Sequence, residues 1–163
     1  MSKLQGVLPW TRSCFVCGEA NPHGLHLRSR IEGDRVVLDY TTRESDLGYR
    51  HIVHGGLAIT LLDEIMTWAA IVNARRACVA AEVTARLKKP IGVGQVLRAE
   101  AWVTKSSSRV ILVESELKSP EGDLFLLASG KYMPMPEAQV HLTAKDFIVS
   151  PDALHPDDIM TGG

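Results

Sequence analysis

The stretch that decides the fold is HGGLAITLLDEIMTWAAIVN, residues 54–73. It consists mostly of helix formers, and its few polar side chains recur at intervals of three, one and three residues. They are Thr60, Asp63, Glu64 and Thr67. This spacing places all four on one narrow face of a helix. The other faces are apolar, far beyond the single stripe of a surface helix. We therefore expect one long helix over residues 55–73, mostly buried, with other elements wrapped around it.

Strand-like segments lie on both sides of this helix. Before it, residues 25–30 alternate apolar and polar side chains, a Gly-Asp turn follows, and residues 35–40 are rich in β-formers, which predicts a hairpin. After it, we expect four strands in meander, at residues 81–88, 96–105, 109–118 and 124–133. The order of hairpin, helix and meander predicts an α+β domain whose mostly antiparallel sheet curls around one helix.

The chain has 163 residues, which suits one domain with a tail. We expect an ordered-loop lead-in over residues 1–24, the folded domain over 25–133 and an irregular tail over 134–163. The 18 basic and 19 acidic residues are scattered, which argues against nucleic-acid binding. The apolar helix is interrupted and shorter than the ~20 residues of a membrane span. Because the N-terminus also lacks a secretory signal, we expect a cytoplasmic protein.

A His-Gly-Gly triplet, residues 54–56, stands at the start of the helix. Glycine lets a backbone N–H approach a ligand closely, and the unpaired donors of a helix N-terminus suit an oxyanion. Asp63 follows nine residues after His54, on the only polar face of the helix. A carboxylate there faces water, a partner subunit or a substrate, since its burial without a partner is costly. The simpler interpretation is a Gly-Gly turn followed by a solvated helix face.

Two segments resemble one known family. Residues 48–66, GYRHIVHGGLAITLLDEIM, are similar to the signature of hotdog-fold acyl-CoA thioesterases of the phenylacetate-degradation type. The lead-in CFVCG at residues 14–18, followed by NPHGL at 21–25, resembles one branch of that group. The resemblance covers about residues 14–133. It implies the hotdog fold, in which a curved sheet surrounds one central helix, as the pattern of elements also predicts.

The resemblance implies a role for each residue of the signature. Asp63 would act as general base on water or as nucleophile, and the Gly56 N–H would polarise the thioester carbonyl. His54 and Gly55 would shape the turn. Relatives often carry Asn or Gln six residues before the His, where this chain has Gly48. These relatives also often carry Thr or Ser ten residues before the proline that ends the strand, where this chain has Ala80 before Pro90. Thr84 or Glu64 could supply the missing polar side chain.

Basic side chains that could meet the phosphates of coenzyme A lie near strand ends. They are Arg86, Lys88, Lys89 and Arg109. We expect them to bind substrate together with Gly55 and Glu64, although a solvated strand face would show the same charges.

The three cysteines are expected to be reduced. Cys14 and Cys17, with His23 and His26, have the side chains of a tetrahedral zinc site, but only five residues separate the pair from the first histidine. We favour buried thiols over zinc or a redox role, with Cys78 in the core, and expect neither a metal nor a cofactor.

These observations predict an acyl-CoA thioesterase that hydrolyses its substrate to free acid and CoA. The resemblance implies a site between two subunits, hence a homodimer or a dimer of dimers. The alternative is a non-catalytic acyl-CoA or lipid-binding hotdog protein. Gly48 and Ala80 favour this alternative, because they stand where catalytic relatives often carry polar side chains. A hydratase of the same fold is the weaker third hypothesis. The sequence does not specify the acyl group.

Overall fold

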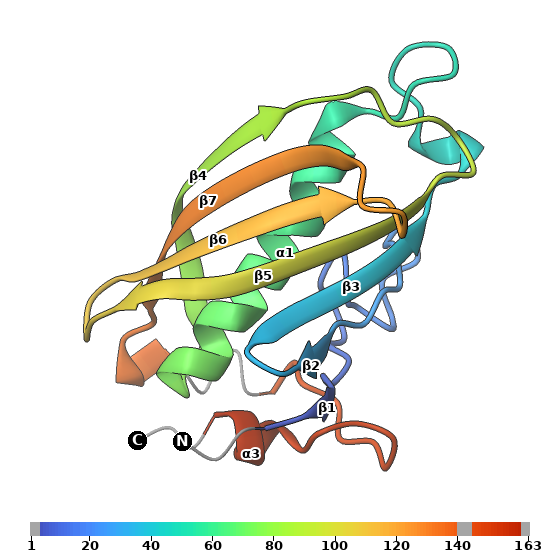
Figure 1. Ribbon diagram of the computed structural model, residues 1–163. Coiled ribbons are helices and arrows are strands. Elements are labelled where there is room, and N and C mark those ends of the chain that lie inside the picture. Colours follow the sequence, from blue (N-terminus) through green and yellow to red (C-terminus); the bar gives the residue numbers. More distant parts are fainter. Residues whose placement is uncertain (1–3, 140–144, 161–163) are drawn as a thin grey trace.

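The computed structural model describes residues 4–139 and 145–160. Its framework is one sheet that curves across one long helix, α1 (Gly55–Ala74) (Figure 1). The strands run β1-β2-β3-β5-β6-β7-β4 across the sheet, and all neighbouring strands are antiparallel. They are β1 (Gly6–Val7), β2 (Arg30–Glu32), β3 (Arg35–Thr41), β4 (Cys78–Leu87), β5 (Val96–Ser106), β6 (Ile111–Lys118) and β7 (Leu124–Pro134). This is the hotdog fold, and the predicted α+β class is confirmed.

Helix α1 packs against five strands of the sheet, which are β3, β4, β5, β6 and β7. Nine of its twenty residues are buried. They are Ala58, Leu61, Leu62, Ile65, Met66, Trp68, Ala69, Ala70 and Ile71. By length and composition α1 is apolar enough to cross a membrane. Packing against the sheet accounts for that composition, because burial of apolar surface stabilises the fold by ~25 cal/mol per Å². The helix ends at Arg75, which takes a left-handed conformation with φ of 56°.

Two expected details of the sheet are wrong. Only β5, β6 and β7 form a meander, because β4 pairs with β7 at the sheet edge and β5 pairs with β3. The segment expected as a strand over 25–30 contributes only Arg30 to β2. Leu25 and Leu27 instead donate their N–H groups to the carbonyls of Phe15 and Val16. The alternation there reflects packing of the lead-in, and the positive φ of His26, 55°, interrupts the extended chain.

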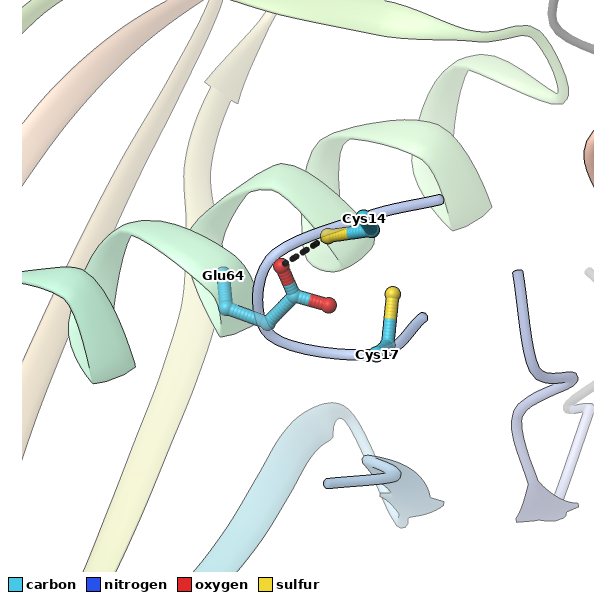
Figure 2. Close-up of side chains that lie close together, drawn as sticks. All are labelled: Cys14, Cys17 and Glu64. Carbon is cyan, nitrogen blue, oxygen red and sulfur yellow. Dashed lines mark hydrogen bonds between the residues drawn. The ribbon is translucent and has the colours of Figure 1, made fainter. Parts of the chain in front are cut away.

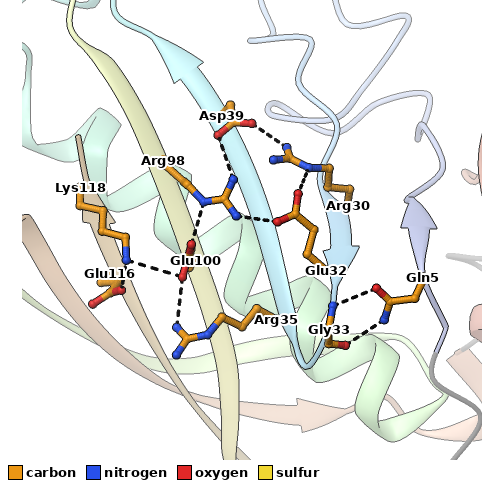
Figure 3. Close-up of polar contacts among 10 residues, drawn as sticks. All are labelled: Gln5, Arg30, Glu32, Gly33, Arg35, Asp39, Arg98, Glu100, Glu116 and Lys118. Atoms are coloured by element: carbon orange, nitrogen blue, oxygen red, sulfur yellow. Dashed lines mark hydrogen bonds and ion pairs between the residues drawn. The ribbon is translucent and has the colours of Figure 1, made fainter. Parts of the chain in front are cut away.

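The face of the sheet opposite α1 carries a network of ion pairs (Figure 3). Its centre is Glu100 on β5, whose carboxylate lies 2.7 Å from Arg98, 3.2 Å from Arg35 and 3.8 Å from Lys118. Arg98 also reaches Glu32 on β2 at 2.6 Å. Burial alone would raise the pKa of Glu100, but the surrounding cations hold it below its ordinary value. The network therefore joins four strands on the solvent side.

The lead-in and the C-terminal segment pack together at the β1 edge of the sheet (Figure 1). Leu154 donates its N–H to Val7, and Ile148 donates to Trp10, both at 2.8 Å. Residues 145–160 mostly lack regular structure but include the short helix α3 (Pro156–Ile159), in which Ile159 is fully buried. The remaining tail residues, 140–144 and 161–163, lie outside the described residues.

The opposite edge strand, β4, is largely exposed. It pairs with β7 on one side only, and most of its ten residues face solvent. Val79 is 49% exposed and Leu87 is 56% exposed. A long edge strand with exposed apolar side chains is a template for pairing with another chain.

Candidate active site

The N-terminus of α1 is fixed by His54, which is its N-cap residue. The His54 Nδ1 atom accepts a hydrogen bond from the Gly56 N–H at 2.9 Å. A Cβ on Gly56 would lie 2.9 Å from that same Nδ1, so the ring needs a glycine there. The Gly55 N–H, at the first helical position, has no intrahelical acceptor and forms no hydrogen bond within residues 4–139 and 145–160. The free donor at this helix start is therefore Gly55, whereas the N–H of Gly56, the predicted donor, is bound to the cap.

The loop before the helix holds His54 in place through Asp46. The Asp46 carbonyl accepts the His54 N–H at 2.8 Å, and its buried carboxylate accepts the Tyr40 hydroxyl at 2.6 Å. A Cβ on Gly48 would lie 3.1 Å from the His54 Cα. Position 48 therefore has little room for a side chain as large as an amide.

A cavity of about 650 Å³ lies beside this turn. Its walls are mostly apolar, with His54 and Gly55 on one side and two lysines on another. The lining residues are Gly48, Tyr49, Ile52, Val53, His54, Gly55, Ala58, Leu87, Lys88, Lys89, Pro90, Ile91, Phe125 and Leu126. This volume and composition are typical of small-molecule sites. The structure thus brings four of the predicted site residues, His54, Gly55, Lys88 and Lys89, into one cavity.

Asp63 lies further along α1 and does not line this cavity. Its Oδ1 accepts a hydrogen bond of 2.7 Å from the hydroxyl of Tyr132 on β7. Tyr132 is fully buried, and burial together with the Asp63 carboxylate raises its pKa above the ordinary value. The phenol therefore stays protonated and holds one Asp63 oxygen, which leaves the other available. Tyr132 is the cross-strand partner of Ala80, the position without the expected hydroxyl.

The two halves of the predicted machinery are far apart within one chain. Asp63 is eight positions after Gly55, and a helix rises 1.5 Å per residue, so the two residues lie ~12 Å apart along its axis. A hydrogen-bond donor and a general base acting on one carbonyl both lie within about 3 Å of the reacting atoms. One protomer therefore cannot supply both groups to one substrate.

Glu64 points toward the lead-in, where Cys14 and Cys17 lie (Figure 2). Its Oε2 lies 3.7 Å from the Cys14 Sγ, and its Oε1 accepts the Trp68 Nε1–H at 2.9 Å. Burial and the neighbouring Cys14 raise the pKa of Glu64 to about 7. Cys17 completes the cluster, and its hydrogen bond to Cys14 lowers the pKa of the Cys14 thiol. Glu64 thus lies apart from the cavity residues with which it was expected to bind substrate.

The other predicted residues lie apart from the cavity. Arg86 is exposed on β4 and is not among its lining residues. Arg109 lies in the turn between β5 and β6, where Ser106 bonds to Asn73 near the C-terminal end of α1. That turn is at the opposite end of the helix from Gly55. His23 and His26 do not belong to the cysteine cluster.

Sequence reasoning missed Tyr132, Leu87 and Phe125. Tyr132 was read only as a β-former, and no motif marks its contact with Asp63. Leu87 and Phe125 line the cavity from β4 and β7, which are separated by two other strands in sequence. Only the pairing of β4 with β7 brings them together.

Comparison with known proteins agrees with this architecture. The model of the thioesterase superfamily matches residues 51–126. A solved thioesterase superfamily protein has a TM-score of 0.65 at 20% identity, and the match covers 75% of this chain and 60% of that one. The search of curated proteins found no significant match.

Two further solved structures share the fold. The E. coli PaaI protein from the phenylacetic acid degradation operon has a TM-score of 0.61 at 23% identity, covering 68% of this chain and 78% of its own. A hypothetical thioesterase protein from Streptococcus pneumoniae TIGR4, solved with coenzyme A, has a TM-score of 0.59 at 18% identity, covering 64% and 83%. The thioesterase superfamily model thus matches the part of the chain that contains α1, and these solved structures share the hotdog fold with this chain.

Proposed function

We propose that this protein hydrolyses acyl-CoA thioesters. The observation that carries the proposal is the free N–H of Gly55, a residue at the start of α1 that lines an apolar cavity together with Lys88 and Lys89. A fixed backbone donor at a helix N-terminus stabilises the negative charge that develops on a thioester oxygen. The apolar walls suit an acyl chain or the pantetheine arm, and the two lysines suit the phosphates of CoA.

In this mechanism Asp63 acts as general base on a water molecule. The water oxygen attacks the thioester carbon while its proton passes to Asp63, and the Gly55 N–H stabilises the oxyanion. The C–S bond then breaks, and Asp63 returns the proton to the CoA sulfur, which leaves as the free thiol. Tyr132 positions Asp63 by holding Oδ1 at 2.7 Å, so that Oδ2 is directed at the water. Direct attack by Asp63 is the variant of this scheme that forms an anhydride.

The ~12 Å between Gly55 and Asp63 implies that the two groups come from different protomers. We propose a two-fold dimer in which the turn of one chain meets the helix of the other. The exposed β4 edge, with Val79 and Leu87, supplies a surface suited to such pairing. Light scattering should give a mass of at least two chains, and a fully active monomer would contradict the shared site.

An acyl-CoA ligand is supported by the Streptococcus pneumoniae protein of the same fold, which was solved with coenzyme A. Lys89 forms an exposed ion pair of 3.1 Å with Asp123, which is weak enough to exchange for a phosphate. Lys88→Ala and Lys89→Ala should raise KM for acyl-CoA with little effect on kcat. They should not affect a truncated thioester substrate that lacks phosphates.

The test is release of free thiol from a panel of short, long and aromatic acyl-CoAs. An Asp63→Asn preparation made in parallel controls for contaminating thioesterases. Turnover of one class that is lost in this variant supports the proposal. Binding of acyl-CoA without turnover across the panel would reject it and favour a non-catalytic binding protein.

A further inference from the structure

A second cluster of reactive side chains lies between α1 and the lead-in. It contains the Cys14 and Cys17 thiols and the Glu64 carboxylate (Figure 2), with one atom of each within 4.8 Å of the others. We propose that these three side chains bind a Zn²⁺ ion, with water in the fourth position of a tetrahedral site. This inference does not depend on the proposed hydrolysis of thioesters.

The ligand types and their spacing fit zinc. Zinc binds cysteine sulfur at ~2.3 Å and carboxylate oxygen at ~2.1 Å, so a sulfur and an oxygen in a tetrahedral site lie ~3.6 Å apart. The Cys14 Sγ lies 3.7 Å from the Glu64 Oε2. No separation in the cluster exceeds 4.8 Å, which rotation of one side chain can close. The sequence pattern favoured buried thiols over a zinc site with His23 and His26, whereas the structure places a glutamate from the central helix beside the two thiols.

Each of the three groups has an outer partner that orients it. Trp68 holds Oε1 of Glu64 at 2.9 Å, so that Oε2 is directed at the sulfur of Cys14. The Val16 N–H donates to the Cys14 sulfur at 3.4 Å, and the Thr11 hydroxyl lies 3.5 Å from the other thiol. Such hydrogen bonds fix ligand orientation in metal sites. A hydrophobic core position would not need them.

The lead-in is shaped to present both thiols. Gly18 donates its N–H to the Cys14 carbonyl at 2.9 Å, which closes the turn. A Cβ on Gly18 would lie 2.2 Å from that carbonyl oxygen, so only glycine fits. Three acidic groups in a partly buried place are costly to ionise together, and a divalent cation removes that cost. The ion would tie the lead-in to α1 one residue beyond Asp63.

Metal content and Co²⁺ absorption test the proposal without any activity measurement. The tag-free protein, with reduced thiols, is dialysed with Zn²⁺ and then against buffer, and should retain about one Zn²⁺ per chain. Loading with Co²⁺ instead should give thiolate-to-metal charge-transfer absorption. Cys14→Ser and Glu64→Gln should each weaken Zn²⁺ binding by more than the ~10- to 100-fold that loss of an outer partner costs.

The matched control is Cys78→Ser, because Cys78 is also free and buried but bonds to the Arg76 carbonyl outside the cluster. It should bind Zn²⁺ as the unchanged protein does. Absence of Zn²⁺ and of the Co²⁺ absorption in the unchanged protein would overturn the proposal, whatever the folding of the variants. Undiminished Zn²⁺ affinity in folded Cys14→Ser would overturn it as well.

Discussion

Replacing Gly55 with proline would remove the proposed oxyanion donor and little else. Residue 55 is the first helical position, where proline is favoured because that N–H has no partner within the helix. The preceding His54 has φ of −60° and ψ of 126°, a conformation that tolerates a following proline. The added Cβ would lie 2.8 Å from the Leu87 Cδ2, which is the end of a flexible side chain that can shift.

Gly55→Ala is the matched control, since it adds the same Cβ and keeps the N–H. Loss of one oxyanion donor costs about 2.7–4 kcal/mol, or 10²- to 10³-fold in kcat. We therefore expect Gly55→Pro to be that much slower than Gly55→Ala. Both variants should melt at or above the temperature of the unchanged protein, because each restricts the unfolded chain.

The assay is thiol release at saturating acyl-CoA, with the melting temperature measured on the same preparations. Equal kcat in the two variants would refute the role of the Gly55 N–H. The earlier expectation that Gly56 is the donor would then regain support, provided that the His54 ring turns away from its N–H.

Three further predictions concern single side chains. Asp63→Asn should lower kcat by ~10²-fold or more. Its stability should change little, because the amide oxygen can still accept the hydrogen bond of the Tyr132 hydroxyl. The control Asp152→Asn, at an exposed position, should leave kcat unchanged. Tyr132→Phe should lower kcat by ~10-fold or more with little change in KM, as expected of a positioning residue, and an equal fall of kcat and rise of KM would contradict this role. Glu100→Gln should lower the melting temperature near pH 7 but not at low pH. The lowered pKa of the Glu100 carboxyl contributes stability above about pH 4.5, and this stability is lost as the pH falls through the folded-state pKa. A difference in melting temperature between the variant and the unchanged protein that does not vary with pH would contradict this.

The sequence predicted the central helix and the later strands well because their signals are local. The alternation of residues 96–105 and 124–133 depends only on which face of each strand is buried. The place of β4 was mispredicted because strand order depends on contacts distant in sequence, and no local pattern shows that Ala80 pairs with Tyr132.

The candidate site was predicted less completely for a related reason. The spacing of His54 and Asp63 indicated a functional helix, but it could not show which backbone N–H would donate a hydrogen bond to the His54 ring. Adjacent residues on a helix point ~100° apart, so Asp63 and Glu64 face different neighbours. The sequence could not show that the lead-in packs where Glu64 points, so the zinc alternative that it weighed and did not favour named the nearby histidines instead.

A complementation experiment tests most directly that the site is shared between two chains. Asp63→Asn and Gly55→Pro are each expected to be nearly inactive, and are co-expressed in equal amounts. In a mixed dimer one site receives both mutations and the other receives none. Because half of the dimers are then mixed, the account predicts recovery to about a quarter of the wild-type rate. A rate no higher than that of either variant alone, with mixed dimers demonstrated by native mass spectrometry, would contradict it.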